Sequence, residues 1–271
     1  MSRIAARFER LKNEKQKGFI PFITAGDPDL QTTQELLVAL SRAGSTVIEL
    51  GVPFSDPMAD GPVIQRASER ALRHNFNISS ILETVASARS LIDTPIILFS
   101  YFNPLLQFGI DRLVREAAAA GVDGVLVTDL TPEEAGDVSA ALRANALDMI
   151  FLVAPTSTDE RLALIAKHAS GFIYAVSRRG VTGQQENISR EAEELVRRVR
   201  NFSQLPIAVG FGLSNSEQVL RTWQYADAAV VGSAIVAEIE RLGGAPDLVP
   251  QVIRFVGNLI PQTEEISTSK Q

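Results

Sequence analysis

The fold is decided by the stretch from residue 19 to residue 51, which reads FIPFITAGDPDLQTTQELLVALSRAGSTVIELG. Its two ends, Phe19–Thr24 and Val47–Gly51, are short apolar runs of the kind that form buried strands. Between them, Leu30–Ala43 carries apolar residues at three- and four-residue spacing, which predicts an amphipathic helix. A strand, a helix and a second strand in this order predict parallel strands joined by a right-handed crossover.

The same alternation continues along the chain. Further strands are predicted over Ile96–Phe99, Gly124–Thr128, Met149–Val153, Phe172–Val176, Ile207–Gly210 and Ala228–Gly232. Further helices are predicted over Ile78–Leu91, Ile110–Ala120, Pro132–Asn145, Asp159–His168, Arg190–Phe202, Ser216–Gln224, Ile235–Leu242 and Leu248–Leu259. Eight such units in about 240 residues predict an α/β fold, a closed (β/α)8 TIM barrel that forms a single domain over residues 1–271. The alternative is an open doubly wound sheet, which is disfavoured because the first strand–helix turn, Thr24–Pro28, lacks a glycine-rich dinucleotide fingerprint.

The two ends of the chain lie outside this repeat. In residues 1–17, Ile4, Phe8 and Leu11 recur at helical spacing among many charged residues, which predicts an N-terminal cap helix rather than a signal peptide. The last residues, about 262–271, are polar and are predicted to form a frayed tail.

Composition excludes several functions. The 26 Lys and Arg residues against 32 Asp and Glu give a net charge of −6, which argues against nucleic acid or an anionic membrane surface as the main partner. The chain has no cysteine, so disulfides, thiolate nucleophiles and cysteine metal sites are excluded, and no metal site is predicted. No apolar run approaches the ~18 residues of a membrane span. These features fit a cytoplasmic protein.

Two carboxyl groups are the strongest candidates for chemistry. Glu49 lies at the end of a predicted buried strand, and Asp60 lies beyond it in a segment rich in Pro and Gly. Carboxyl groups in different environments can titrate apart and divide acid and base work. Each also has a simpler interpretation: Glu49 as a strand-end carboxylate paired with a neighbouring Arg, and Asp60 as a turn or helix-cap residue before Pro62.

Other side chains should meet these carboxyl groups, because barrel enzymes carry their active sites at the C-terminal ends of the strands. The strand ends and the turns after them contribute Phe22, Thr24, Phe99, Tyr101, Asp129 and Tyr174. Phe22 and Tyr174 could equally be ordinary core aromatics.

Three glycine-rich segments, Ser177–Gly183, Gly210–Ser214 and Gly232–Ala234, follow the last three predicted strands. Glycine lets backbone N–H groups approach an anion, and a helix N-terminus adds a favourable dipole. Barrels often bind phosphate at this position, so the segments predict a phosphate site. The alternative is that these glycines serve only tight turns.

The stretch Leu50–Pro62, LGVPFSDPMADGP, closely resembles the signature of the tryptophan synthase alpha chain family. The resemblance covers nearly the whole chain and includes Phe22–Pro28, Asp129 with Glu133 and Glu134, Ser177–Gly183, Gly210–Gly212 and Gly232–Val236. It implies a lyase of tryptophan biosynthesis that splits indole-3-glycerol phosphate into indole and glyceraldehyde 3-phosphate by retro-aldol cleavage. It also implies that the chain uses no cofactor, and that pyridoxal phosphate belongs only to a partner beta chain in an α2β2 assembly.

The resemblance further implies roles for individual residues. Glu49 would be the general acid and base, and Asp60 would bind the indole N–H group. The substrate-binding residues would be Phe22, Ile64, Phe99, Tyr101, Tyr174, Thr182, Gly183, Gly210, Gly212, Gly232 and Ser233. Contacts with a beta chain are expected through the loops 53–60, 101–108 and 129–134.

Two positions depart from the family pattern as we know it. Thr131 stands where Pro or a small apolar residue is common, and Arg179 adds a second cation to its loop. Both bear on the affinity for a partner rather than on the catalytic groups. Three other functions stay open at this stage: a lyase that needs no beta chain, a non-catalytic subunit that activates a partner, and a phosphosugar isomerase on the same fold.

Overall fold

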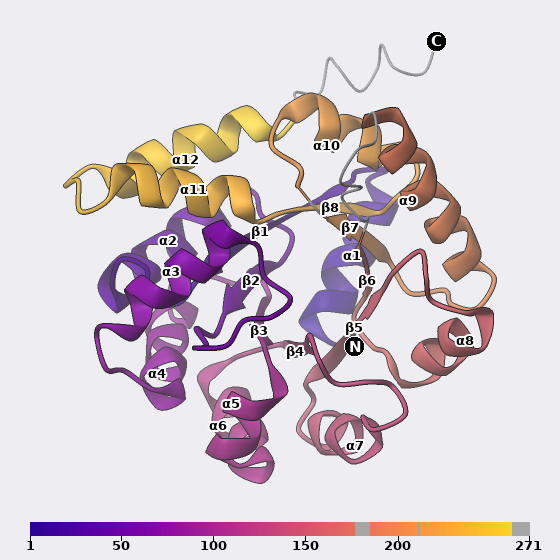
Figure 1. Cartoon of the computed structure of the whole chain (residues 1–271), viewed down its shortest axis with the longest axis horizontal. Coiled ribbons are helices and arrows are strands. Elements are labelled where there is room, and N and C mark those ends of the chain that lie inside the picture. The colour runs from indigo at the N-terminus through magenta and orange to yellow at the C-terminus, as the bar shows by residue number, and fades with distance from the viewer. Residues whose placement is uncertain (177–184, 211, 262–271) are drawn as a thin grey trace.

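The computed structural model describes residues 1–176, 185–210 and 212–261 of the 271-residue chain. Within these residues, eight parallel strands pair in chain order, and β8 pairs with β1 to close a barrel (Figure 1). The strands are β1 (Gly18–Thr24), β2 (Ile48–Gly51), β3 (Ile96–Ser100), β4 (Gly124–Val127), β5 (Asp148–Val153), β6 (Ile173–Val176), β7 (Ile207–Gly210) and β8 (Ala228–Val231). The predicted (β/α)8 barrel is confirmed, whereas the predicted 262–271 tail lies outside the described residues.

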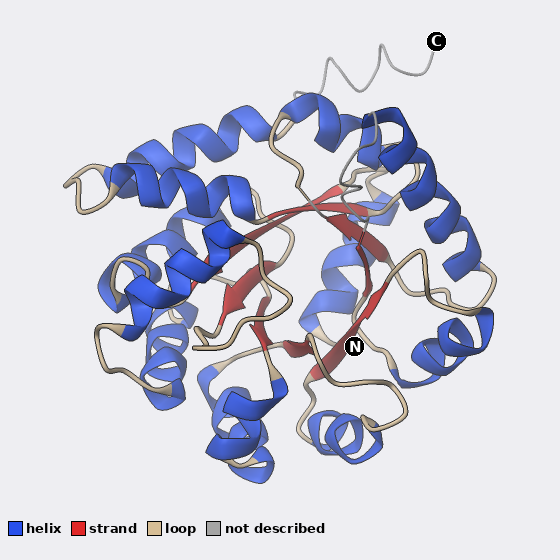
Figure 2. Ribbon diagram, viewed as in Figure 1, coloured by secondary structure: helices blue, strands red, loops and turns tan. Residues whose placement is uncertain are grey.

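Helices form a ring around the strands (Figure 2). They are α1 (Arg3–Asn13), α2 (Leu30–Arg42), α3 (Pro62–Leu72), α4 (Ile78–Arg89), α5 (Phe102–Phe108), α6 (Ile110–Ala120), α7 (Gly136–Ala144), α8 (Asp159–His168), α9 (Gln185–Arg200), α10 (Ser216–Trp223), α11 (Ser233–Leu242) and α12 (Leu248–Leu259). Of the helices that the structure describes, none is both long and apolar enough to cross a membrane.

The sequence analysis missed two of these helices and misplaced two helix starts. Helices α3 and α5 were not predicted: α5 has only seven residues, and α3 follows directly on a segment rich in Pro and Gly. Helix α7 begins at Gly136 rather than Pro132, and α9 begins at Gln185 rather than Arg190. Helix α3 matters most, since it carries Ile64 and follows directly after Asp60.

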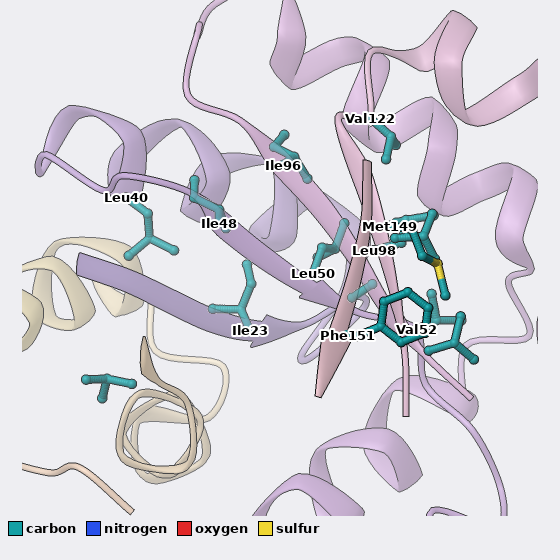
Figure 3. Packing of buried hydrophobic residues seen from close by; sticks show 14 of the residues in the cluster. Ile23, Leu40, Ile48, Leu50, Val52, Ile96, Leu98, Val122, Met149 and Phe151 are labelled. Atoms are coloured by element: carbon teal, nitrogen blue, oxygen red, sulfur yellow. The ribbon is translucent and has the colours of Figure 1, made fainter. Parts of the chain in front are cut away.

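Alternate residues of each strand face the barrel interior. Ile20, Ile97 and Phe172 belong to a buried interior cluster, together with Val47, Leu126, Ile150, Ala208, Ala228 and Val230. Their neighbours in sequence point outward and pack against the helices, as Figure 3 shows for Ile23, Ile48, Leu50, Ile96 and Leu98. Successive strand residues point to opposite faces, so Glu49 shares the interior face with Val47.

Helix α1 packs against the interior of the barrel at the end where the strands begin. Its apolar residues Ile4, Phe8 and Leu11 join the interior cluster, and the rings of Phe8 and Phe172 lie 5.9 Å apart. The helix begins after Ser2, whose hydroxyl accepts a hydrogen bond from the Ala5 N–H group at 3.2 Å. The predicted N-terminal cap helix is therefore confirmed. It closes the end of the barrel at which the strands begin, which we call the stem (Figure 1).

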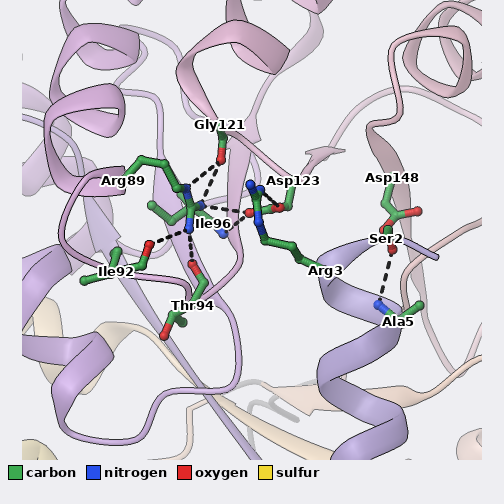
Figure 4. A network of polar contacts seen from close by, with 10 residues as sticks. All are labelled: Ser2, Arg3, Ala5, Arg89, Ile92, Thr94, Ile96, Gly121, Asp123 and Asp148. Atoms are coloured by element: carbon green, nitrogen blue, oxygen red, sulfur yellow. Dashed lines mark hydrogen bonds and ion pairs between the residues drawn. The ribbon is translucent and has the colours of Figure 1, made fainter.

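A polar network at the same end holds α1 in place (Figure 4). Asp123, which is 5% exposed, accepts hydrogen bonds from Arg3 at 2.6 Å, from Arg89 at 2.9 Å and from the backbone of Ile96 at 2.9 Å. Ser2 donates to Asp148 at 2.6 Å. The network joins α1, α4 and the starts of β3, β4 and β5, because Asp123 and Asp148 lie at the start of β4 and β5.

Replacing Asp123 with Ala should lower the free energy of unfolding by about 3–5 kcal/mol, because it leaves the largely buried Arg89 cation without its carboxylate. Urea unfolding monitored by circular dichroism measures this change. The control is Glu116→Ala, which removes the exposed partner of Arg112 and should cost less than about 1 kcal/mol. Equal losses for the two variants would contradict a structural role for the Asp123 network.

Candidate active site

A small pocket opens at the C-terminal ends of the first three strands. It is lined by Phe22, Thr24, Gly51, Val52, Asp60, Ile64, Ser68, Phe99, Ser100 and Tyr101. Its free volume is only about 10 Å³, about the minimum that a single water molecule needs. A larger ligand therefore requires the surrounding side chains or loops to move apart.

Glu49 lies in β2 beside this pocket, in register with Phe22 of β1 and Ile97 of β3. Its side chain is 1% exposed, and within the described residues its Oε1 atom has no hydrogen-bond partner. Burial raises the pKa of Glu49 well above its ordinary value, since a charged carboxylate is poorly stabilised in a dry interior. Burial therefore favours the neutral, protonated form of the Glu49 carboxyl group.

Tyr174 of β6 is a second buried polar group of the interior. Burial raises the pKa of its phenol well above the ordinary value, and the charge of Glu49 raises it further. The Tyr174 ring lies over Gly210, where a side-chain carbon would come within 2.5 Å of the phenol oxygen. Glycine at position 210 is thus required by the packing of Tyr174, which favours the simpler explanation of this glycine.

Asp60 lies in the connection between β2 and α3, at the rim of the pocket. The Tyr101 hydroxyl accepts a hydrogen bond from the Ala59 N–H group at 2.9 Å and also hydrogen-bonds the Asp60 side chain. Burial raises the pKa of Asp60 to about 6, although the hydrogen bond from Tyr101 opposes this rise. The two carboxyl groups thus differ in environment: the pKa of Asp60 is about 6, and the pKa of Glu49 is raised well above its ordinary value.

The apolar wall of the pocket is built around Phe22. Its ring meets Phe99 edge to face at 5.3 Å, and these two residues join Ile64 in a small cluster. A side-chain carbon at position 51 would come within 2.5 Å of the Phe22 ring, so Gly51 makes room for it. The result is an aromatic wall beside the two carboxyl groups.

The proposed phosphate residues lie at the next strand ends around the barrel. Gly232 precedes α11, of which Ser233 is the exposed first residue, and a side-chain carbon at Gly232 would lie 3.3 Å from Phe22. The first N–H groups of a helix lack intrahelical acceptors and favour anions. Gly212 has a φ of 71°, which favours glycine. Thr182 and Gly183 lie outside the described residues.

An ion-pair network connects α3 and α11, the two helices that flank the mouth of the barrel, which is the end at which the strands finish and the pocket opens. Arg66 of α3 makes two hydrogen bonds of 2.7 Å to Glu240 of α11. Arg70 of α3 bonds Glu240 at 2.7 Å and the buried Asp27 twice at 2.8 Å. The helix after Asp60 is thereby fixed relative to the helix that begins at Ser233.

The structure thus brings together six of the thirteen predicted site residues. Phe22, Asp60, Ile64, Phe99 and Tyr101 line one pocket, with Glu49 beside it. Sequence analysis did not select two further lining residues, Ser68 and Ser100. Ser68 lies one helical turn after Ile64 and would have been found from that spacing had α3 been predicted. Among the described residues, no group of three or more His, Cys, Asp or Glu forms a possible metal site.

Comparison with known proteins agrees with this geometry. The family model of the tryptophan synthase alpha chain matches residues 8–259. The chain belongs to this family. The tryptophan synthase alpha chain of Solibacter usitatus is 47% identical over 96% of this chain and 97% of its own length.

Solved structures of the family have the same fold. The alpha subunit of tryptophan synthase from Legionella pneumophila superposes with a TM-score of 0.89, is 36% identical and covers 99% of both chains. A chain of the tryptophan synthase a2b2 complex from Pyrococcus furiosus gives a TM-score of 0.83 at 39% identity, over 89% of this chain and 97% of its own.

Replacing Tyr101 with Phe should raise the pKa of Asp60 further above about 6, because it removes the hydrogen bond that favours the ionised carboxylate. A ¹³C NMR titration of the Asp60 carboxyl group measures this change. The control is Phe54→Leu, which removes the ring 5.3 Å from Tyr101 but keeps the hydroxyl. An Asp60 pKa in the Phe variant at or below the wild-type value would contradict the assigned role of Tyr101.

Proposed function

We propose that this chain is the alpha subunit of a tryptophan synthase and cleaves indole-3-glycerol phosphate to indole and glyceraldehyde 3-phosphate. The observation that carries the proposal is Glu49, a fully buried carboxyl group whose Oε1 atom has no hydrogen-bond partner among the described residues, beside a pocket that also contains Asp60. Two carboxyl groups whose environments separate their pKa values divide acid and base roles. Family membership supplies the substrate class.

The reaction breaks the bond between C3 of the indole ring and the carbinol carbon of the glycerol chain. Glu49 donates a proton to C3, which places a positive charge on the ring nitrogen. As the carbon–carbon bond breaks, the carbinol oxygen becomes the aldehyde and releases its proton to the Glu49 carboxylate. Glu49 returns to its protonated form, so the cycle consumes no proton and requires no cofactor.

Asp60 stabilises the intermediate of this reaction. Its carboxylate would accept the N–H group of the indole ring, whose positive charge is greatest after protonation at C3. A pKa of about 6 keeps Asp60 mostly ionised near neutral pH. The aromatic wall of Phe22 and Phe99 suits the flat indole ring, and Ile64 adds to this apolar cluster. We assign Tyr174 to the same site on the family resemblance.

The phosphate group of the substrate would bind at the N-terminus of α11, at Gly232 and Ser233. We assign Gly212, Thr182 and Gly183 to the same phosphate site on the family resemblance, and Gly210 to the packing of Tyr174 next to it. This distribution suits an acidic chain, because backbone N–H groups rather than a basic patch would hold the anion.

A beta chain would bind over the mouth, in an α2β2 assembly. Of the three proposed contact segments, 101–108 is largely helix α5 rather than a loop. The segments carry two exposed apolar side chains, Met58 at 93% and Leu106 at 51% exposure. Asp129 accepts a hydrogen bond from the Phe102 N–H group at 2.7 Å and so joins two of these loops. Thr131 bonds Glu134 at 3.0 Å, whereas Arg179 lies outside the described residues. We also propose that residues 1–271 act as a single domain in the cytoplasm, with pyridoxal phosphate bound only by the beta chain.

The test is indole release from indole-3-glycerol phosphate by the purified chain, with and without a tryptophan synthase beta chain. We expect slow release alone and faster release with the beta chain. Glu49→Gln should lower the rate by about 10²–10⁴ while substrate binding, measured by calorimetry, persists. The control Glu69→Gln removes an exposed carboxylate of α3 and should leave the rate unchanged.

Each alternative function has its own outcome in this assay. Fast release that ignores the beta chain would favour a self-sufficient lyase. Absence of release, combined with activation of the beta chain, would favour a non-catalytic activating subunit. Near-normal turnover by Glu49→Gln would remove Glu49 from the mechanism.

Replacing Ser233 with Asp should raise the KM for substrate by about tenfold or more, because a carboxylate at the helix N-terminus repels the phosphate. The fold should persist, since helix N-termini favour acidic side chains. Ser233→Asn is the matched control of equal size and no charge. Steady-state kinetics of both variants measures the effect, and an unchanged KM in the Asp variant would place the phosphate elsewhere.

A further inference from the structure

A second and larger cavity, of about 490 Å³, lies at the opposite end of the barrel from the candidate active site. Its walls include Phe19 and Thr46 at the starts of the first two strands, whereas the active-site pocket includes Thr24 and Gly51 at their ends. Helix α1, the end of α2 and the loop between α4 and β3 complete it. The proposed lyase chemistry makes no use of this cavity.

The charges on the walls of this cavity differ in sign from the chain as a whole. Its described lining includes the cations Arg7, Arg10 and Lys17 and one carboxylate, Asp93, which leaves an excess of two positive charges. The whole chain has a net charge of −6. A cationic cavity in an acidic protein concentrates small anions at that place.

Arg7 is the cation least compensated by its surroundings. It is half-buried, and within the described residues it makes no ion pair; its guanidinium lies 3.5 Å from the Thr94 hydroxyl. Burial lowers the pKa of Arg7 from its ordinary value, with a smaller contribution from Arg10 and an opposing one from Asp93. By contrast, Arg10 pairs with Glu14 at 3.7 Å, and Lys17 donates to the Ala226 carbonyl at 2.6 Å.

The wall opposite α1 is rigid and carries hydroxyl groups. Arg89 bonds the carbonyls of Ile92 at 3.2 Å and Thr94 at 2.9 Å, which fixes this loop, as Figure 4 shows. The hydroxyls of Thr94 and Ser41 are 2.7 Å apart. A hydroxyl pair next to a guanidinium that makes no ion pair among the described residues offers an oxyanion several donors from fixed positions.

Part of the remaining lining is apolar, beside the polar residues Gln16, Ser45 and Thr46. Leu11, Phe19, Ile92, Trp223 and Ile260 contribute to the walls, and the volume falls within the range of small-molecule sites. A ligand that matches both parts has one anionic head for Arg7 and a compact apolar body for these side chains.

We propose that this cavity is a binding site for a small organic anion, a carboxylate or phosphate ester with a compact apolar body, anchored by Arg7. The ligand would join α1 to the loop between α4 and β3, so its binding would stabilise the closed stem of the barrel by mass action.

Trp223 allows this site to be observed separately, because it is the only tryptophan in the chain and it lines the cavity. Tryptophan fluorescence of the full chain is titrated with benzoate and with benzyl phosphate. Benzamide and benzyl alcohol serve as neutral counterparts of similar size. We expect saturable binding of at least one anion, with the neutral compounds at least about tenfold weaker. The stronger of the two anions identifies the head group.

Two variants decide whether Arg7 is the anchor. Arg7→Met should weaken binding of the anion by about tenfold or more, because it removes the charged donors and keeps the length of the side chain. Lys12→Met removes one exposed charge from the same helix outside the cavity and should change binding less than about twofold. Thermal unfolding of both variants confirms that they fold, and the anion should raise the wild-type midpoint.

Several results would overturn the proposal. These are absence of saturable binding to the wild-type chain, equal binding of the anions and their neutral counterparts, and unchanged binding by a folded Arg7→Met variant. Indole release by the Arg7→Met variant provides a further test. If benzoate or benzyl phosphate inhibits it at the concentrations used for the titration, the anion acts at the active site instead.

Discussion

The chemistry of this protein depends on the alternation of side chains along a closed barrel. Every second residue of a strand enters the interior, and closure leaves that interior no edge through which water can enter. The side chain of Val47 faces the interior and packs in its apolar cluster. Glu49, two residues later, places a carboxyl group on the same interior face. The same geometry that makes a dry core therefore makes an acid. Its raised pKa requires no neighbouring negative charge, because burial alone accounts for it.

A carboxyl group in such a place is tolerated because the two ends of the barrel are built differently. At the stem, Phe8 packs on Phe172, and Asp123 joins α1 to two further elements, so this end resists opening. At the mouth, the packing is local: Phe22 and Phe99 form a small cluster. Ion pairs between α3 and α11 fix these two helices relative to one another. Rigid helices around a loosely closed pocket let the loop that carries Asp60 change position without disturbing Glu49.

Sequence alone predicted the barrel because its signal is repeated eight times, and errors at single helices do not change the topology. It also predicted that Glu49 and Asp60 lie at the same end of the barrel, because the C-terminal ends of the strands and the loops after them share that end in this fold. It missed α3, whose buried face consists of Ile64, Ala67, Ser68 and Ala71, so that small residues hide the helical pattern. It could not predict the partnership of Tyr101 with Asp60 or the cavity at Arg7, because both arise from segments brought together only by the fold.

The two carboxyl groups impose opposite demands on the mouth. The burial that raises the pKa of Glu49 requires that water be kept away, whereas the substrate enters only if the pocket, now about 10 Å³, opens. The connection through residues 53–60 reconciles these demands. It is held at Ala59 by a hydrogen bond to Tyr101, and such a bond contributes only about 0.5–1.5 kcal/mol. Met58 is already exposed, so displacing the loop exposes little further apolar surface at that position. The same connection is also held by the Phe54 ring, 5.3 Å from Tyr101, and by the hydrogen bond between Tyr101 and Asp60, so Tyr101 is the common partner of its contacts with β3. Closing the connection over the pocket restores the burial that raises the pKa of Glu49.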